Sequence, residues 1–382
     1  MHDRLQDILG NGIFTVDGHS WKFQRKTAAN IFSVKNFREF VETVFKNEMD
    51  LVFEKVNDSL SDPIDVHDLF FRFTLDGFAQ IGFGTQLNCM NNQSIPFAMA
   101  FDRCQAAMDF RFFSPLWKLE EMIFFWKKIQ LRRDMKTIRD FGLDLIQKRR
   151  SEPESPNNSR ADLLTLFMRA KDADGNPFSD ELLCDFILNF IIAGRDTTAQ
   201  ALSWAIYEIT QYPKVQQKLL EEIENSIGQD APTYDQCKEM KYANAVFNET
   251  LRLHPSVPKN VKEAAVDEVF PDGTVVPKGS LVAWSPYVMG RSKAIWGPSA
   301  REFDPDRWFN FSKPPSAFEY PVFHAGPRQC LGKNLAELEG VFVLVSLFQK
   351  YQISSVPDQS VSYGNSLTLP MNKPFLCNFK RR

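Results

Sequence analysis

The residues best suited to do chemistry lie in the run FHAGPRQCLG at 323–332. Within this run, Cys330 stands between a glycine-containing loop and the first turn of a helix that we expect from Leu331 to Gln352. Sulfur binds a metal as a thiolate, and a helix N-terminus or a nearby cation lowers the pKa of a thiol. The expected helix and a neighbouring positive charge offer both, so the sequence predicts an ionised, metal-binding sulfur at Cys330.

The residues around this cysteine suit a large planar ligand. Gly326 and Gly332 let the backbone approach something flat and bulky, and Arg328 brings a cation to it. A haem meets these requirements, because it offers iron to the sulfur, a ring to the glycines and propionates to the arginine. A buried core cysteine would be the better interpretation of Cys330 alone. The complete pattern Phe-x-x-Gly-x-Arg-x-Cys-x-Gly, which begins at Phe323, argues against it.

A second unusual segment is AGRDTT at 193–198, inside a long stretch with helical periodicity. Gly194 costs a helix interior about 1 kcal/mol relative to alanine, and Asp196 and Thr197 are also poor helix formers. Local propensity is therefore violated here. Taken by itself, the segment is best interpreted as a tolerated kink in which the Thr197 hydroxyl bonds to a carbonyl one turn earlier.

Two further patterns say little in isolation. Trp21 and Arg25 share one face of an expected helix at a spacing of i, i+4, as on any amphipathic edge. Glu249 and Arg252 stand three residues apart on another helix, which is usually a surface pair worth a few tenths of a kcal/mol, about 0.2–0.5. Both gain meaning only from the other motifs.

Helical periodicity dominates the first two-thirds of the chain. The longest helix should begin after Ser179, which can cap it, and end at Tyr212, because Pro213 follows. Turn signals between short β-rich runs predict small strands within 267–284, and a further β segment is expected at 366–370. The sequence therefore predicts a mainly α fold with a small β-sheet region.

The chain shows no linker that would divide it. Its 382 residues are 43% hydrophobic and include 35 phenylalanines, enough to build a large core. The polar stretch 151–160 is interpreted as a surface loop, because a helical pattern resumes at Asp162. We therefore expect a single domain spanning 1–382.

Charge and cysteine usage exclude several classes of protein. A net charge of -3 argues against general nucleic-acid binding. The six cysteines are scattered without a Cys-x-x-Cys pair, which fits reduced thiols better than a disulfide framework. No apolar run reaches the roughly 18 residues of a membrane-spanning helix, so no membrane span is expected in this chain.

The pattern at 323–332 resembles the haem-binding loop of the cytochrome P450 family, and the other motifs occur in the family's order from Trp21 to Gly332. The resemblance implies the triangular, prism-shaped fold of that family and a haem b whose iron has the Cys330 thiolate as axial ligand. It assigns Phe323, Gly326 and Gly332 to the haem-binding loop.

The resemblance also gives roles to the charged motifs. It implies that Trp21, Arg25 and Arg328 hold the haem propionates, together with a basic residue ten positions after the Glu-x-x-Arg arginine. That position is often arginine in the family and is Lys262 here, which keeps the charge but loses the bidentate fork.

The same resemblance implies a buried structural network of charged side chains. In it, Glu249, Arg252 and Arg307 would lock their helix to the segment that precedes the haem loop. Their expected role is in folding and haem retention.

The resemblance implies a haem-thiolate monooxygenase, with electrons supplied from NADPH through a separate flavoprotein reductase. In this family Gly194 would loosen the long helix to make room for dioxygen, Thr197 would hydrogen-bond the oxygen being reduced and Asp196 would relay protons to it. The substrate would be lipophilic. Because Ala193 stands where one branch of fatty-acid hydroxylases has a haem-esterifying glutamate, we expect a non-covalent haem.

Short stretches such as AGRDTTA at 193–199 and MGR at 289–291 look most like the long-chain fatty-acid ω-hydroxylases of eukaryotes. Two other functions stay open. One is a haem-thiolate isomerase or dehydratase of fatty-acid hydroperoxides, which needs no proton relay, so that the Asp196–Thr197 pair argues against it. The other is a non-catalytic, truncated haem-binding fragment.

Relative to the family, we expect that the membrane anchor, the proline-rich hinge, the first helices and the outer strands of the small sheet are absent before the Trp21 helix. Family members of this type lie on the cytosolic face of the endoplasmic reticulum membrane. A chain without the anchor could instead be cytoplasmic.

Overall fold

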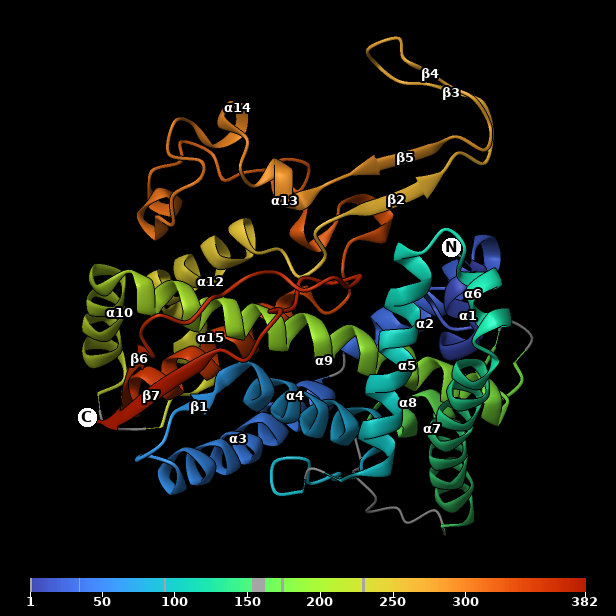
Figure 1. The fold of residues 1–382 in the computed structure, drawn as a ribbon, viewed down its shortest axis with the longest axis horizontal. Coiled ribbons are helices and arrows are strands. Elements are labelled where there is room, and N and C mark those ends of the chain that lie inside the picture. Colours follow the sequence, from blue (N-terminus) through green and yellow to red (C-terminus); the bar gives the residue numbers. More distant parts are fainter. Residues whose placement is uncertain (1, 34, 93, 153–161, 173–174, 229–230) are drawn as a thin grey trace.

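Helices dominate the computed structural model, which describes residues 2–33, 35–92, 94–152, 162–172, 175–228 and 231–382 (Figure 1). The α-helices are α1 (His2–Leu9), α2 (Gly18–Ser33), α3 (Lys35–Asp58), α4 (Val66–Phe83), α5 (Pro96–Phe113), α6 (Trp117–Ile123), α7 (Phe125–Ser151), α8 (Leu163–Arg169), α9 (Asp180–Gln211), α10 (Pro213–Ser226), α11 (Tyr234–Glu239), α12 (Lys241–Leu253), α13 (Pro286–Met289), α14 (Lys293–Trp296) and α15 (Lys333–Lys350). Short 3-10 helices are η1 (Pro305–Phe309), η2 (Pro321–Phe323) and η3 (Gly326–Arg328). The predicted fold class is confirmed.

The strands form small antiparallel sheets. They are β1 (Ile64–Asp65), β2 (Asn260–Glu263), β3 (Glu268–Val269), β4 (Val275–Val276), β5 (Leu281–Trp284), β6 (Tyr351–Ser355) and β7 (Leu376–Arg381). β7 lies between β1 and β6, whereas β2 pairs with β5 and β3 with β4. The strands predicted within 267–284 are therefore present. In Figure 1 the β3–β4 hairpin projects from the body of the molecule.

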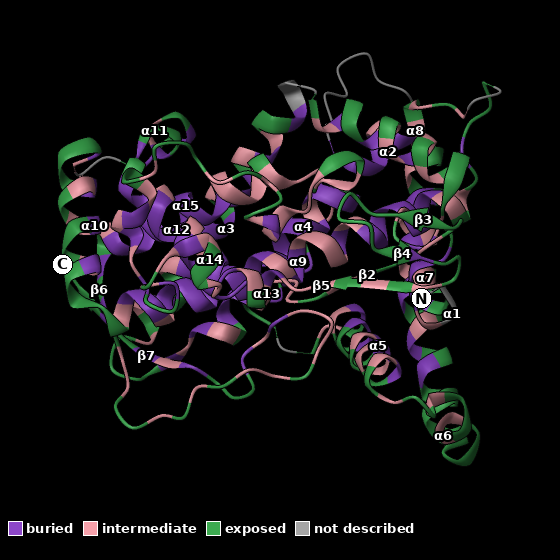
Figure 2. Ribbon diagram, turned by 90° about the horizontal axis from the view of Figure 1, so that it is seen from above, coloured by how far each residue is buried: buried purple, intermediate pink, exposed green. Residues whose placement is uncertain are grey.

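Helix α9 runs through the middle of the molecule, and most of its residues are buried (Figure 2). It begins as predicted, because the Ser179 side chain caps it by accepting a hydrogen bond from the Leu182 N–H at 3.3 Å. It ends at Gln211, and Pro213 opens α10. Helix α4 packs along α9. Helix α9 therefore provides a largely buried support for residues 193–198.

Gly194 is explained by this packing. A Cβ atom at Gly194 would lie 2.1 Å from the Phe78 ring of α4, closer than any side chain allows. The helix continues without interruption through Gly194. The glycine therefore permits close contact between α4 and α9, and that it also loosens the helix for dioxygen stays a prediction.

Two sequence predictions near the C-terminus need correction. The helix expected from Leu331 to Gln352 is shorter, because α15 begins at Lys333 and the chain enters β6 at Tyr351. The segment 366–370 is not a strand. Its backbone donors bond outside any strand: the Leu367 N–H donates to Asp109 at 2.9 Å, and the Leu369 N–H is shared between Gln200 at 2.9 Å and the Ser256 carbonyl at 3.0 Å.

The loop predicted before Asp162 lies mostly outside the described residues. The helix predicted after it is present as α8, with Asp162 as its cap: the Asp162 side chain accepts a hydrogen bond from the Thr165 N–H at 2.9 Å. Among the described helices, none is long and apolar enough to cross a membrane.

Candidate active site

The loop before α15 presents Cys330 on an ordered turn. The Cys330 N–H donates to the Phe323 carbonyl at 2.7 Å, and the Gln329 N–H donates to the Gly326 carbonyl at 3.1 Å. Gly326 has φ +63°, a left-handed conformation that glycine adopts without strain. Gly332 is the N-cap residue of α15. Cys330 is exposed, whereas the other cysteines are buried.

The groups around Cys330 raise the pKa of its thiol rather than lower it. The surrounding loop removes hydration and raises the pKa of Cys330; the Gly332 N–H and Arg25 oppose the rise, and Glu337 adds to it. The predicted lowering of the pKa by the helix start and a nearby cation is therefore wrong in its net direction, because desolvation outweighs both the Gly332 N–H at the N-cap of α15 and Arg25. A metal ion bound to the sulfur would supply the missing positive charge, since coordination deprotonates a thiol.

Beside the loop, an indole and several cations gather. The Arg328 guanidinium carbon lies 4.0 Å from the Trp21 ring centroid, and that of Arg25 lies 5.9 Å from it. Arg25 also donates to the Gln329 carbonyl, which holds α2 against the cysteine loop. Arg328 pairs with Asp17 at 2.9 Å. The predicted residues Trp21, Arg25 and Arg328 are thus brought together.

Lys262 of β2 completes this cationic group. Partial desolvation lowers the pKa of Lys262, and Arg328 lowers it further. The pKa of Arg25 is likewise lowered, by burial first and also by Arg328. The cations therefore repel one another, and the carboxylate that approaches them, Asp17, is 89% exposed. An excess of positive charge beside an accessible cysteine fits a haem, which carries two propionates.

Phe323 lies at the start of the same loop. It ends η2 and is partly buried against the core, and the Lys333 ammonium lies 5.9 Å from its ring centroid. Its carbonyl accepts the Cys330 N–H, so this residue helps to fix where the sulfur lies.

The charged network expected from Glu249 is present and buried. The Glu249 carboxylate accepts two hydrogen bonds from Arg252, at 2.7 and 2.8 Å, and one from Arg307 at 2.9 Å. It also accepts the Asp304 N–H at 2.9 Å and the Trp308 indole N–H at 3.0 Å. These contacts join α12 to η1, in the segment that precedes the cysteine loop.

Asp196 and Thr197 face different surroundings. The Thr197 hydroxyl donates to the Ala193 carbonyl at 2.6 Å, the local bond of the simpler interpretation, yet this side chain is only partly buried. Asp196 is 1% exposed and accepts a hydrogen bond from Gln105 of α5. Burial raises the pKa of Asp196 to about 7, with Arg195 opposing the rise. The two residues are neighbours on α9, but in the part of the chain that the structure describes no hydrogen bond joins their side chains.

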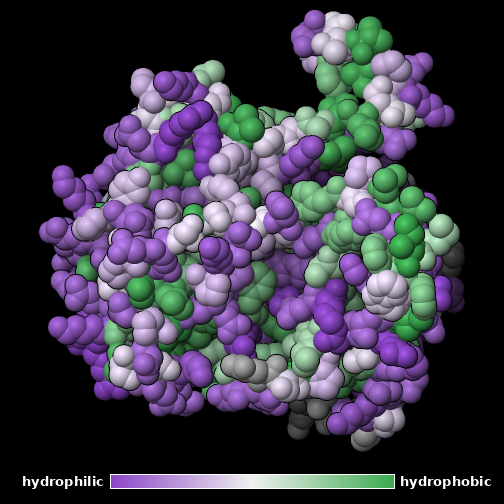
Figure 3. All heavy atoms as spheres, viewed as in Figure 1, coloured by the Kyte–Doolittle hydropathy of each residue, from purple (hydrophilic) through white to green (hydrophobic). Residues whose placement is uncertain are grey.

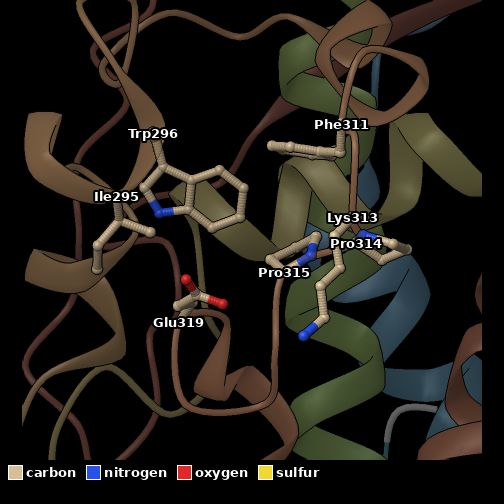
Figure 4. A pocket seen from close by; sticks show the side chains of 7 residues that line it. All are labelled: Ile295, Trp296, Phe311, Lys313, Pro314, Pro315 and Glu319. Atoms are coloured by element: carbon tan, nitrogen blue, oxygen red, sulfur yellow. The ribbon is translucent and has the colours of Figure 1, made fainter.

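Two hollows lie near these elements. A small one of about 210 Å³ is lined by Trp296, Phe311, Glu319 and their neighbours (Figure 4). None of the predicted site residues lines it, and the rings of Trp296 and Phe311 stand 5.9 Å apart across it. A larger one of about 640 Å³ lies between α4, α5, α9 and the segment 364–374. Its lining includes Gln105 and Arg195.

Sequence reasoning missed three residues of the site. Gln105 and Arg195 contact Asp196, and Asp17 pairs with Arg328. Arg195 stands next to the singled-out acid, so its charge was a usable signal. Gln105 and Asp17 lie 91 and 311 positions from their partners, and no local pattern marks them.

Comparison with known sequences gives consistent results. The family profile described as Cytochrome P450 matches residues 1–377. The chain is 36% identical to cytochrome P450 monooxygenase cyp1 of Mycosarcoma maydis, over 98% of this chain and 63% of that protein. It is 35% identical to cytochrome P450 86B1 of Arabidopsis thaliana, over 100% of this chain and 72% of that protein. The chain thus spans only part of the length of these relatives.

The fold has a counterpart among solved structures. The crystal structure of the cytochrome P450DA heme domain superposes with a TM-score of 0.88 at 25% sequence identity, covering 100% of this chain and 82% of that one. With the cysteine loop and the cations beside it, these matches show that the chain belongs to the cytochrome P450 family.

Proposed function

We propose that this protein is a haem-thiolate monooxygenase whose residues 1–382 act as one catalytic domain. The carrying observation is an accessible cysteine in a glycine loop, beside a tryptophan and three cations, of which Arg328 pairs with the exposed carboxylate of Asp17. Substrate, dioxygen, NADPH and a proton would give hydroxylated product, water and NADP⁺. A haem b bound here would supply redox-active iron that activates dioxygen for insertion of one oxygen atom into a C–H bond.

Each predicted residue has a defined task in this proposal. Cys330 would bind the haem iron through its sulfur, and the loop residues Phe323, Gly326 and Gly332 shape the approach to it. Trp21 and the cations Arg25, Lys262 and Arg328 would hold the propionates. Thr197 and Asp196 manage protons: the Thr197 lone pairs can accept a hydrogen bond from water on its accessible side, and the pKa of Asp196, about 7, lets it both gain and lose a proton near neutral pH.

We propose a fatty acid as the lipophilic substrate, hydroxylated at or near its terminal carbon. The support is the resemblance of the stretches at 193–199 and 289–291 to ω-hydroxylases. An isomerase or dehydratase of fatty-acid hydroperoxides would make no use of a titrating carboxyl at Asp196, and a non-catalytic fragment would turn over nothing.

The proposed electron donor is an NADPH-dependent flavoprotein reductase. Lys22 and Lys26 are exposed on α2 and flank Arg25, which contacts the cysteine loop. A basic surface beside that loop suits an acidic flavoprotein, because complementary charge speeds encounter.

Thr197→Ala tests the proton chemistry. With a reductase and a long-chain fatty acid, NADPH-dependent oxygen uptake should continue while hydroxylated product falls by a factor within the ~10²–10⁴ range of positioned proton transfer, and hydrogen peroxide should rise. Oxygen uptake, product and peroxide are measured together. The matched control is Thr210→Ala, on the same helix, whose hydroxyl also bonds to a backbone carbonyl.

Unchanged product per oxygen in Thr197→Ala would leave the local helix bond as the only role of this residue. Oxygen uptake that continued without the reductase would count against the proposed partner.

We also propose that the protein works at a membrane surface, at the endoplasmic reticulum. The end of α5, α6 and the start of α7 expose many large apolar side chains, and α6 stands out from the body as an exposed element (Figure 2). Apolar side chains also gather over this edge in Figure 3. The exposed residues include Phe113, Leu116, Leu119, Met122, Ile123, Phe125 and Trp126. Lys118, Lys127 and Lys128 lie among them, which suits anionic lipid headgroups.

Changing Met122 and Trp126 together to glutamate should reduce binding to vesicles that contain anionic lipid by at least about tenfold, because each large apolar side chain contributes ~1.5–3 kcal/mol when buried. Flotation of the protein with the vesicles measures this. The control changes Val288 and Phe318, which are equally exposed elsewhere, to glutamate. Equal binding by both double variants would exclude this surface as the lipid contact.

A further inference from the structure

We propose that the 640 Å³ hollow between α4, α5, α9 and the segment 364–374 is a water-filled inlet that brings protons to Asp196, and that Gln105 is the positioning residue linking the inlet to this carboxyl. The inference rests on the proposed monooxygenase function and names a route that this function needs. Each turnover consumes two electrons and two protons. The reductase would supply the electrons, and the protons would enter here.

The lining of the hollow suits water. Helix α4 and its cap contribute acidic and basic groups, α5 contributes acids and an amide, and the segment 364–374 adds further polar groups. These side chains include Asp65, His67, Arg72, Asp102, Gln105, Asp109, Arg195, Asn365, Ser366 and Lys373. Apolar side chains, among them Phe71, Leu75 and Met99, complete the lining. The volume far exceeds the ~10–15 Å³ that one water needs, and the polar groups offer water the hydrogen-bond partners that it requires.

Gln105 connects this hollow to a carboxyl that does not itself line it. The Gln105 amide N–H donates to Asp196, and its carbonyl oxygen accepts from Arg195 at 3.3 Å. Arg195 in turn pairs with Asp102, at the outer side of the hollow. An amide does not titrate near neutral pH, so Gln105 orients the carboxyl without carrying the proton itself.

Orphaned polar atoms point to water at the inner end. The second Asp196 oxygen, which lies 3.5 Å from an Arg195 nitrogen, and the Arg195 Nε are buried without a hydrogen-bond partner in the described part of the chain. A buried polar atom left without a hydrogen bond is destabilising, and a bridging water removes this cost. Water reaching these atoms would join the hollow to Asp196.

The charges around Asp196 agree with a group that exchanges its proton. Burial raises its pKa; Arg195 of α9 lowers it, and Asp102 and Asp109 of α5 raise it. From α4, His67 faces the same hollow; burial and Arg195 lower the pKa of His67, against the opposing effect of Asp65 and Asp68. Asp196 can therefore take a proton from water in the hollow and release it toward the oxygen being reduced near Thr197.

The test compares Gln105→Leu with Gln217→Leu, the same substitution at an exposed position on α10. Gln105→Leu should lower product per oxygen consumed about tenfold in the reductase-driven reaction and increase the solvent deuterium isotope effect. Turnover driven by added hydrogen peroxide, which brings its own oxygen and protons, should match that of the Gln217 variant. An unchanged isotope effect together with unchanged product per oxygen would overturn the inlet.

A second readout does not depend on turnover. The carboxyl infrared band that is missing in Asp196→Asn should titrate near pH 7 in the unchanged protein. It should move to higher pH in Gln105→Leu, which loses a donor to the carboxylate, and to lower pH in Asp102→Asn, which loses a neighbouring negative charge. A band that fails to titrate, or that moves the same way in both variants, would refute the proposal. A protein that shows these titrations but hydroxylates nothing would refute the proposed function and leave the inlet standing.

Discussion

Replacing Cys330 with alanine should abolish the thiolate-type absorption band of the reduced, carbon-monoxide-bound protein. The expected loss is complete, because the signature comes from sulfur bound to the haem iron and Cys330 is the exposed cysteine. The absorption spectrum of the haem-loaded chain, before and after addition of carbon monoxide, measures it. Hydroxylation should disappear with the band.

The controls for this experiment are Cys89→Ala and Cys237→Ala. Both cysteines are buried, and burial raises the pKa of each thiol far above neutrality, to about 12 for Cys237, so neither is a ready ligand. Their variants should keep the band. A thiolate-type spectrum that survived Cys330→Ala would contradict the central assignment, whereas loss of the band in all three variants would indicate a general failure to fold.

Glu249→Ala should cost about 3–5 kcal/mol of unfolding free energy. Glu249 is fully buried and bonds to both Arg252 and Arg307, which are themselves buried, so its removal leaves two positive charges without their partner. The folded-to-unfolded ratio would fall by a factor of roughly 10² to 4 × 10³, since 1.4 kcal/mol corresponds to tenfold. Urea unfolding followed by circular dichroism measures the change.

Glu224→Ala is the matched control, because Glu224 is 61% exposed and pairs with Arg382 at the surface. Such a pair is worth only about 0–1 kcal/mol. If the two variants unfolded at the same urea concentration, the buried network would not hold α12 to η1, and a role in haem retention would lose its basis.

The features that could be predicted from the sequence have local causes. Ser179 caps α9 and Pro213 follows its end, so each end of that helix is determined by residues next to it in the sequence. The cysteine loop needs a glycine at 326 for its left-handed turn, and that glycine stands in the motif itself. Trp21 and Arg25 share one helix face, and they meet Arg328 because α2 docks on that loop.

What could not be predicted depends on distant partners. The segment 366–370 has the composition of a strand, yet its backbone donors bond to Asp109, Gln200 and the Ser256 carbonyl, all far away in the sequence. Asp196 was singled out correctly as unusual, but the amide that fixes its direction comes from Gln105, on another helix. The pKa of Cys330 was predicted in the wrong direction, because the desolvation by the folded loop cannot be seen in the motif.

The contact between Gly194 and Phe78 restricts which amino-acid substitutions these two positions can accept during evolution. A methyl group at position 194 would overlap the ring of Phe78, so any larger residue there requires this ring to move. A smaller residue at position 78 alone would leave a void, which typically costs ~3–5 kcal/mol for phenylalanine to alanine. Each single change therefore disturbs the contact between α4 and α9. A change at one position is expected to favour a compensating change at the other.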